Sequence, residues 1–251
     1  MKNNIRDNSC SFVVKTASLA NKKSVRGFTL TELLVAIGLL AAVMASSTMI
    51  FHYSIEAHRT AMATAQVMHS LRAVTDQLNI QLAGLRKDGW LSVGSGDLSF
   101  FTVGDFQSNF RDDIRSNIAW IYFGPANDAN DPNNLLLDIK LVTPNHNSTD
   151  CLMKSFADYQ ANADDLLASG RPHYNPDDPY NLLAQRVTDL EIYWTDGSIV
   201  SNKIQWEKTI KHWKPSDTDW PKALKFTFTI HDSKGIFKEG KTFEHIVYIG
   251  N

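Results

Sequence analysis

Cysteine is scarce in this 251-residue chain, and proline is missing from its first part. The two cysteines are Cys10 and Cys151. With the first 27 residues removed, Cys151 would be alone, which excludes an internal disulfide in the remaining chain. No proline occurs before Pro125, so no residue of that type interrupts a helix in the preceding sequence.

The chain also has no excess of basic residues. A net charge of −2 and a pI near 6.4 give no electrostatic footprint for nucleic acid, which we do not expect as a direct partner. The charge is uneven, however. Residues 1–27 hold six basic residues against one acidic residue, a local balance of +5, which leaves −7 for residues 28–251. A basic head before an acidic body is typical of a membrane protein whose N-terminus stays in the cytoplasm.

Patterns that carry catalysis are missing too. The eight histidines include no His-x-x-x-His pair, and Ser24 and Ser54 lie in no nucleophile-elbow context. Two loops are rich in oxygen ligands that suit calcium, but turns favour the same residues and neither loop has the full ligand spacing. We therefore expect no enzymatic activity, no metal and no cofactor. The loop residues are Asp128, Asn130, Asp131 and Asn133 in one, and Asp177 and Asp178 in the other.

Residues 28–51 form a long apolar run. Eleven of these residues are Leu, Ile, Val or Phe, which together contribute roughly −3 to −7 kcal/mol to membrane insertion. About 20 apolar residues are needed for a helix to cross the hydrocarbon layer. A single acid, Glu32, offsets part of this gain. Insertion still wins, so the segment is predicted to span a membrane.

A cleaved secretory signal is the rival interpretation, but the run is too long and a helical pattern continues beyond it. Apolar residues recur every three or four positions between Val67 and Leu85, which predicts one apolar face on residues 52–88. The glycines at 84 and 89 mark the helix end. We expect one helix from Phe28 to about Lys87, on the order of 90 Å long.

The run from Lys22 to Ala36, KKSVRGFTLTELLVA, resembles the prepilin cleavage and methylation motif. In that family a prepilin peptidase cuts after the glycine and methylates the new N-terminal residue. The resemblance implies cleavage between Gly27 and Phe28 and N-methylation of Phe28. Glycine offers an accessible backbone at the scissile position, and the basic leader, residues 1–27, keeps the N-terminus on the cytoplasmic side.

Glu32 has two interpretations. The first is a carboxylate tolerated near a helix N-terminus, where the helix dipole favours negative charge. The second follows from the family, in which this acid pairs with the methylated amine of a neighbouring subunit during filament assembly. We favour the second, because cleavage creates a positive amine at the same depth.

From residue 89 onward the period changes to that of strands bounded by Gly, Pro, Asn and Asp. This predicts an α+β, pilin-like fold, in which the amphipathic half of the helix packs on an antiparallel sheet within a globular domain of residues 89–251. A weaker pattern predicts a helix between about Cys151 and Ser169. The predicted strands are 98–103, 118–123, 135–142, 187–194, 223–231 and 243–249.

The C-terminal third is similar to the J-type minor pseudopilins of type II secretion and to the W-type minor pilins of type IV pili. The matching segments are 187–197, Trp206 and 220–228. The resemblance implies a minor subunit that initiates or caps a type II secretion pseudopilus, or alternatively a minor pilin of a type IV pilus that serves adhesion, motility or DNA uptake.

A rival from another class is a membrane-anchored periplasmic enzyme or binding module, which would need neither Gly27-Phe28 nor Glu32. The favoured interpretation implies a single pass through the inner (cytoplasmic) membrane, with the C-terminal domain in the periplasm or otherwise outside the cytoplasm. Its partners would be the prepilin peptidase, other pilin-like subunits, an assembly platform protein and the lipid bilayer.

Overall fold

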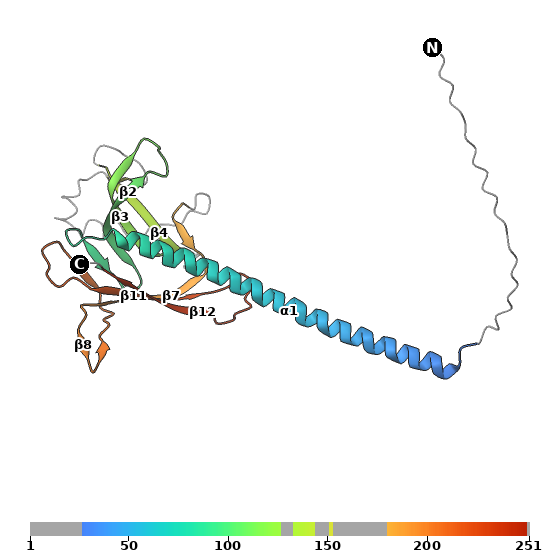
Figure 1. Ribbon diagram of the computed structural model, residues 1–251. Coiled ribbons are helices and arrows are strands. Elements are labelled where there is room, and N and C mark those ends of the chain that lie inside the picture. The colour runs from blue at the N-terminus through green and yellow to red at the C-terminus, as the bar shows by residue number, and fades with distance from the viewer. Residues whose placement is uncertain (1–26, 127–132, 144–150, 153–179, 250–251) are drawn as a thin grey trace, which may run out of the picture. The chain divides into compact units, whose positions relative to one another are not determined.

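The computed structural model describes residues 27–126, 133–143, 151–152 and 180–249 (Figure 1). The chain falls into two compact units, Met1–Tyr53 and Ser54–Asn251. One helix and twelve strands are described: α1 (Leu30–Ala83), β1 (Leu91–Val93), β2 (Leu98–Gln107), β3 (Arg115–Pro125), β4 (Leu135–Val142), β5 (Cys151–Leu152), β6 (Leu182–Ala184), β7 (Val187–Thr195), β8 (Ile199–Val200), β9 (Lys203–Ile204), β10 (Lys211–Trp213), β11 (Ala223–Ile230) and β12 (Lys241–Tyr248).

The strands form two main sheets and a hairpin. The first sheet has the order β10-β1-β2-β3-β4-β5, with β6 also paired to β4; the second has the order β12-β11-β7. All pairs are antiparallel except β4 with β5. β8 and β9 form a separate hairpin, turned by Ser201 and Asn202 at positive φ. The predicted α+β, pilin-like fold is confirmed.

One core joins both sheets to the part of α1 that follows Ser54. In β11, Leu224, Phe226, Phe228 and Ile230 alternate inward and are at most 1% exposed, because a strand turns successive side chains to opposite faces. Across the core, the rings of Phe123 on β3 and Phe226 meet edge to face at 5.8 Å. The α1 residues of this core are Val67, Val74, Leu78 and Leu82, and Leu71 packs against it.

Hydrogen bonds also tie α1 to the strands. Thr102 Oγ1 on β2 donates to the main-chain oxygen of Gln81 at 2.9 Å. Ser233, in the loop after β11, donates through its hydroxyl to Gln66 Oε1 at 2.8 Å. The amphipathic part of the helix is thus packed on the sheets, as its apolar stripe predicts.

Two helix boundaries differ from those expected. α1 begins at Leu30 rather than Phe28, because Thr29 caps it. It ends at Ala83 rather than near Lys87, because Gly84 and Leu85 turn toward β2. The main-chain nitrogen of Val103 donates to Gly84 O at 3.0 Å, and Leu85 forms an antiparallel bridge with Thr102.

The helix predicted from about Cys151 to Ser169 is wrong at its start. Cys151 and Leu152 form β5, which pairs in parallel with the end of β4, since this position completes the edge of the first sheet. The rest of that prediction lies outside the described residues.

Candidate processing and assembly site

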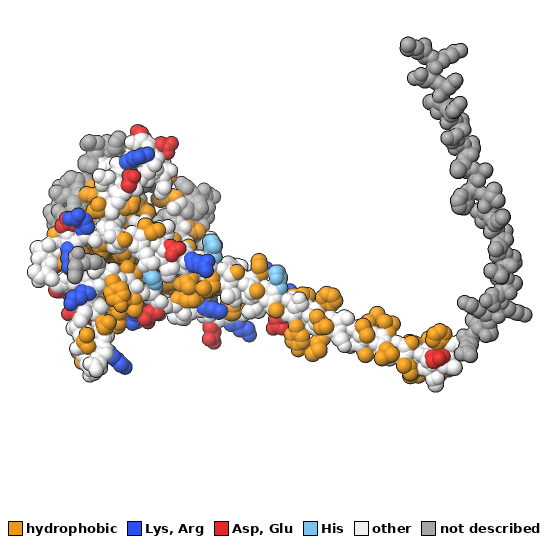
Figure 2. All heavy atoms as spheres, in the orientation of Figure 1, with side chains coloured by type: hydrophobic (Ala, Val, Ile, Leu, Met, Phe, Trp, Pro, Cys, Tyr) orange, Lys and Arg blue, Asp and Glu red, His pale blue; other side chains and the backbone are white. Residues whose placement is uncertain are grey.

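The apolar side chains just before and along the N-terminal part of α1 are exposed in the described chain. Phe28 is 81% exposed and Leu34 is 67% exposed. An 18-residue stretch of this helix is strongly apolar, and none of it is buried. Figure 2 shows apolar side chains along the visible face of this segment. Such a surface is costly in water, and its length and composition suffice to cross a membrane.

Gly27 and Phe28 lie just ahead of the helix, in chain without regular structure. A Cβ added at Gly27 would meet no atom within 4 Å. Packing within the described residues therefore does not require glycine here.

Thr29 and Glu32 form a reciprocal cap at the start of α1. Glu32 Oε2 accepts from the main-chain nitrogen of Thr29 at 3.0 Å and from its hydroxyl at 2.9 Å. The main-chain nitrogen of Glu32 lies 3.3 Å from Thr29 Oγ1, which accepts from it. This is the capping-box arrangement, which satisfies N–H groups that the first helical turn leaves without partners.

Both hydrogen bonds from Thr29 go to the same oxygen of Glu32. Within the described residues, the other oxygen, Oε1, has no hydrogen-bond partner. The carboxylate can therefore cap its own helix and still accept from a donor outside the chain, because an ionised carboxylate has about four acceptor positions.

The structure brings the three predicted site residues to one helix end, with Gly27 and Phe28 just before the cap and Glu32 within it. Sequence reasoning missed Thr29. The Thr-x-x-Glu signature ahead of an apolar run was available to predict the cap.

The two predicted acidic loops belong to the second unit, Ser54–Asn251, called the globular unit below. No cluster of three or more His, Cys, Asp or Glu residues with metal-binding geometry occurs among the described residues. Of the residues in the two acidic loops only Asn133 is described, and its main-chain oxygen accepts from Val187 at 2.9 Å. Asp128, Asn130, Asp131, Asp177 and Asp178 lie outside the described residues.

Most of the tryptophans are core residues. Five of the six are at most 6% exposed, and Trp206 is half-buried. Trp194 and Trp213 pack edge to face at 5.1 Å. Both also donate through their indole nitrogens to main-chain oxygens, those of Thr209 and Asp219.

Residues 22–48 match the family described as the prokaryotic N-terminal methylation motif. No curated protein matches the chain. The matched residues contain Gly27, Phe28, the cap and all but the last three residues of the apolar run. With this motif ahead of a long apolar helix and antiparallel sheets, the chain is a prepilin-type, pilin-like protein.

Proposed function

We propose that this chain is a minor pseudopilin that initiates or caps the pseudopilus of a type II secretion system. It acts by assembly and catalyses no reaction. A prepilin peptidase cuts after Gly27 and methylates Phe28. Residues 28–51 then anchor the chain in the inner membrane, and the globular domain, residues 89–251, stands in the periplasm on the amphipathic helix of residues 52–88.

One observation carries this proposal: the methylation motif at residues 22–48 coincides with an exposed Gly27–Phe28 bond at the start of an uncovered apolar helix. The motif implies processing by prepilin peptidase and assembly with other pilins. An enzyme held by a simple anchor has no need of this combination.

Glu32 would serve assembly through its free oxygen. Cleavage after Gly27 leaves a positive amine on Phe28, four residues before Glu32. In a filament, the amine of one subunit and Glu32 of its neighbour would share a low-dielectric layer, where an unpaired charge is costly. Glu32 Oε1 can accept a hydrogen bond from this amine while Oε2 keeps its two hydrogen bonds from Thr29.

The size of the second unit, Ser54–Asn251, favours a minor over a major subunit, because a bulky domain hinders close repetitive packing. The J-type similarity covers β7, Trp206 and β11. In this region Lys225 Nζ lies over the rings of Tyr193 and Trp206, at 4.7 and 5.0 Å from their centroids. These contacts hold the segment after β9 against the second sheet.

Two measurements test the proposal. N-terminal mass spectrometry of the membrane-extracted chain is expected to find methylated Phe28 as the first residue. An intact leader, or a start near Ala45, would favour the anchored enzyme or binding module instead. Inactivation of the gene is expected to leave secreted proteins trapped in the periplasm. Normal secretion with loss of surface pili would assign the chain to a type IV pilus.

A further inference from the structure

The edges of the first sheet are short. β10 at one edge has three residues and β5 at the other has two. Short edge strands are one of the ways in which proteins prevent unwanted pairing with other chains, because a few unpaired N–H and C=O groups make a poor template.

The β7 edge of the second sheet is protected differently. Asp189 adopts a positive φ of 53° where the register with β11 shifts, so the strand bulges. Farther along, Trp194 and Glu207 exchange two main-chain hydrogen bonds, of 3.0 and 2.9 Å. The bulge and this added segment interrupt the free edge of β7.

The other edge of the second sheet, β12, has neither form of protection. It pairs with β11 over eight consecutive residues without a register shift. It contains no proline, and its outward side can be assigned. The main-chain nitrogen of Ile249 donates to Lys222 O at 2.9 Å. In an antiparallel pair, residues that are hydrogen-bonded to the partner strand alternate with residues that are not. The odd-numbered residues of β12 therefore direct their main-chain N–H and C=O groups toward β11, and the even-numbered residues direct theirs outward.

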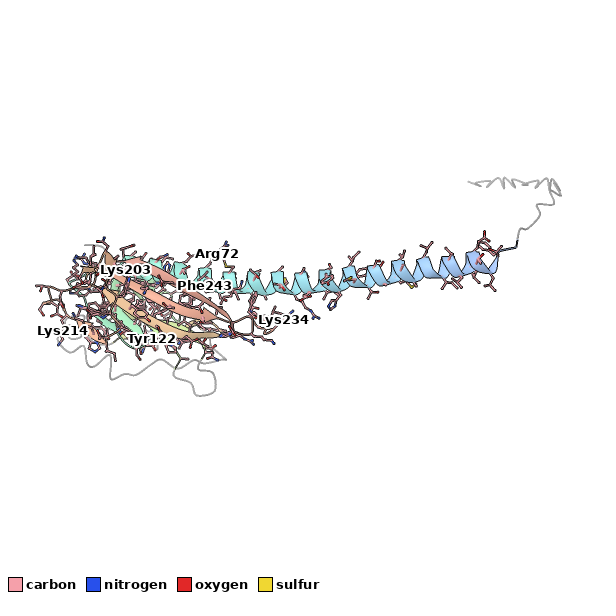
Figure 3. The ribbon with its side chains drawn as sticks, turned by 90° about the horizontal axis from the view of Figure 1, so that it is seen from below. Arg72, Tyr122, Lys203, Lys214, Lys234 and Phe243 are labelled. Carbon is pink, nitrogen blue, oxygen red and sulfur yellow. The ribbon has the colours of Figure 1, made fainter. Side chains whose placement is uncertain are left out.

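The outward main-chain groups are those of Thr242, Glu244, Ile246 and Tyr248. Within the described part of the chain, none of these four residues has a main-chain hydrogen bond on the open side. The strand can be followed in Figure 3, where its Phe243 is labelled. Phe243 and Val247 pack against the core, while Tyr248 is 75% exposed. β12 is thus held firmly on one side and open on the other.

We propose that β12 takes up an extended segment of a neighbouring pilin-like subunit as a fourth strand of the β12-β11-β7 sheet. A row of alternating N–H and C=O groups is complementary to another extended backbone. Ile246 and Tyr248 favour apolar residues beside them on the added strand. Glu244, with a side chain 55% exposed and 3.8 Å from Lys225, favours a basic residue opposite it.

The choice of a pilin-like subunit as the partner rests on the proposed function. The addition of a strand to β12 rests on the open edge of the sheet. The test uses the tagged full chain, purified in detergent from cells that make the sibling prepilins. Ile246→Pro removes an outward N–H but no bond to β11, and proline is tolerated at such edge positions. Ile246→Ala is the matched control, because it shortens the side chain and keeps the N–H.

Ile246→Pro is expected to reduce the co-purified pilin-like subunit about tenfold, and Ile246→Ala to reduce it less than about threefold. Tryptophan fluorescence checks that the variants fold. If the proline variant accumulates poorly, Glu244→Lys decides instead, and it is expected to weaken binding by repelling the basic residue.

If the wild-type chain recovers a pilin-like subunit and Ile246→Pro recovers it equally well, the proposal is overturned. Equal loss with the proline and alanine variants would indicate a side-chain contact and would also overturn strand addition. If Glu244→Lys is the deciding variant, undiminished recovery of the pilin-like subunit would likewise overturn the proposal. A complex made only of copies of this chain would show that the added strand comes from a second copy and not from a different pilin-like subunit. If the wild-type chain recovers no pilin-like subunit, the proposed function fails rather than the use of the edge.

Discussion

His245 on β12 and Asn79 on α1 are joined by a hydrogen bond, with His245 Nε2 3.0 Å from Asn79 Oδ1. An amide oxygen only accepts, so Nε2 carries the proton. Burial lowers the pKa of His245 below its ordinary value of 6.5, although the negative charge of Asp76 acts in the opposite direction. The contact therefore links the packing of α1 against the open-edged sheet to pH.

Acidification is expected to destabilise the globular unit through His245. The folded state binds a proton at this histidine less readily than the unfolded state, so stability falls as pH drops below about 6.5 and through the lower folded pKa. The measurement is the denaturant midpoint of the full chain in detergent at pH 7.5 and 5.5, followed by tryptophan fluorescence. His245→Gln keeps a donor for Asn79 without titrating and is expected to lose less stability. Parallel losses in both proteins would rule out His245 as the source.

The apolar stripe of α1 allows a matched pair of truncations two residues apart. Leu78 is 2% exposed within the main core, whereas Ile80 is 61% exposed. Leu78→Ala is expected to lower the free energy of unfolding by about 2–5 kcal/mol, because it leaves a cavity. Ile80→Ala is expected to change it by less than about 0.5 kcal/mol. Both are measured by denaturation of the full chain, and equal effects would mean that α1 does not pack on the sheets in solution.

Periodicity in the sequence predicted the long strands but not the short ones. β4 was predicted with its observed bounds and β11 to within one residue, because each is long enough to form a run of strand-favouring residues between turn residues, and residues 225–230 of β11 also alternate. β1, β6 and β10 have three residues each, too few for any pattern. These strands exist because neighbouring strands offer free main-chain groups, which only the folded chain brings together.

The functional features also differ in whether the sequence alone could predict them. Gly27, Phe28 and Glu32 lie in a local motif, so the sequence alone was enough to predict them as site residues. The cap by Thr29 was also local, and its signature was present. The open edge of β12 could not be predicted, since its exposure depends on the order β12-β11-β7 and hence on tertiary pairing.

Gly84 ends α1 at a point where a larger residue does not fit. A Cβ at this position would collide with Thr102 Oγ1 and with the main-chain oxygen of Val103. Gly84→Ala is expected to destabilise the globular unit by about 1–3 kcal/mol, because the main chain of β2 must move. Asp88→Ala, which breaks an exposed ion pair with Arg86, serves as a nearby control with little expected effect. Equal unfolding midpoints for the two variants would show that the turn can shift at no cost.

Replacement of Glu32 separates its two roles, the helix cap and the partner of a neighbouring amine. Glu32→Gln keeps an oxygen that can accept from Thr29 but removes the charge. Glu32→Leu removes both. Thr29→Ala keeps the charge and weakens the cap, at a cost of about 0.5–2 kcal/mol. All three keep Gly27 and Phe28, so mass spectrometry is expected to find normal cleavage in each.

Filament assembly is then expected to depend on the negative charge of residue 32 and not on the helix cap. An amine left without its counter-ion in a low-dielectric layer costs more than a lost cap. Glu32→Gln and Glu32→Leu are therefore expected to fail in subunit crosslinking and in filament counts, while Thr29→Ala still assembles. The comparison requires equal expression of all variants in membranes. Normal filaments from Glu32→Gln would reverse the assignment, because the remaining amide can cap the helix but cannot neutralise an amine.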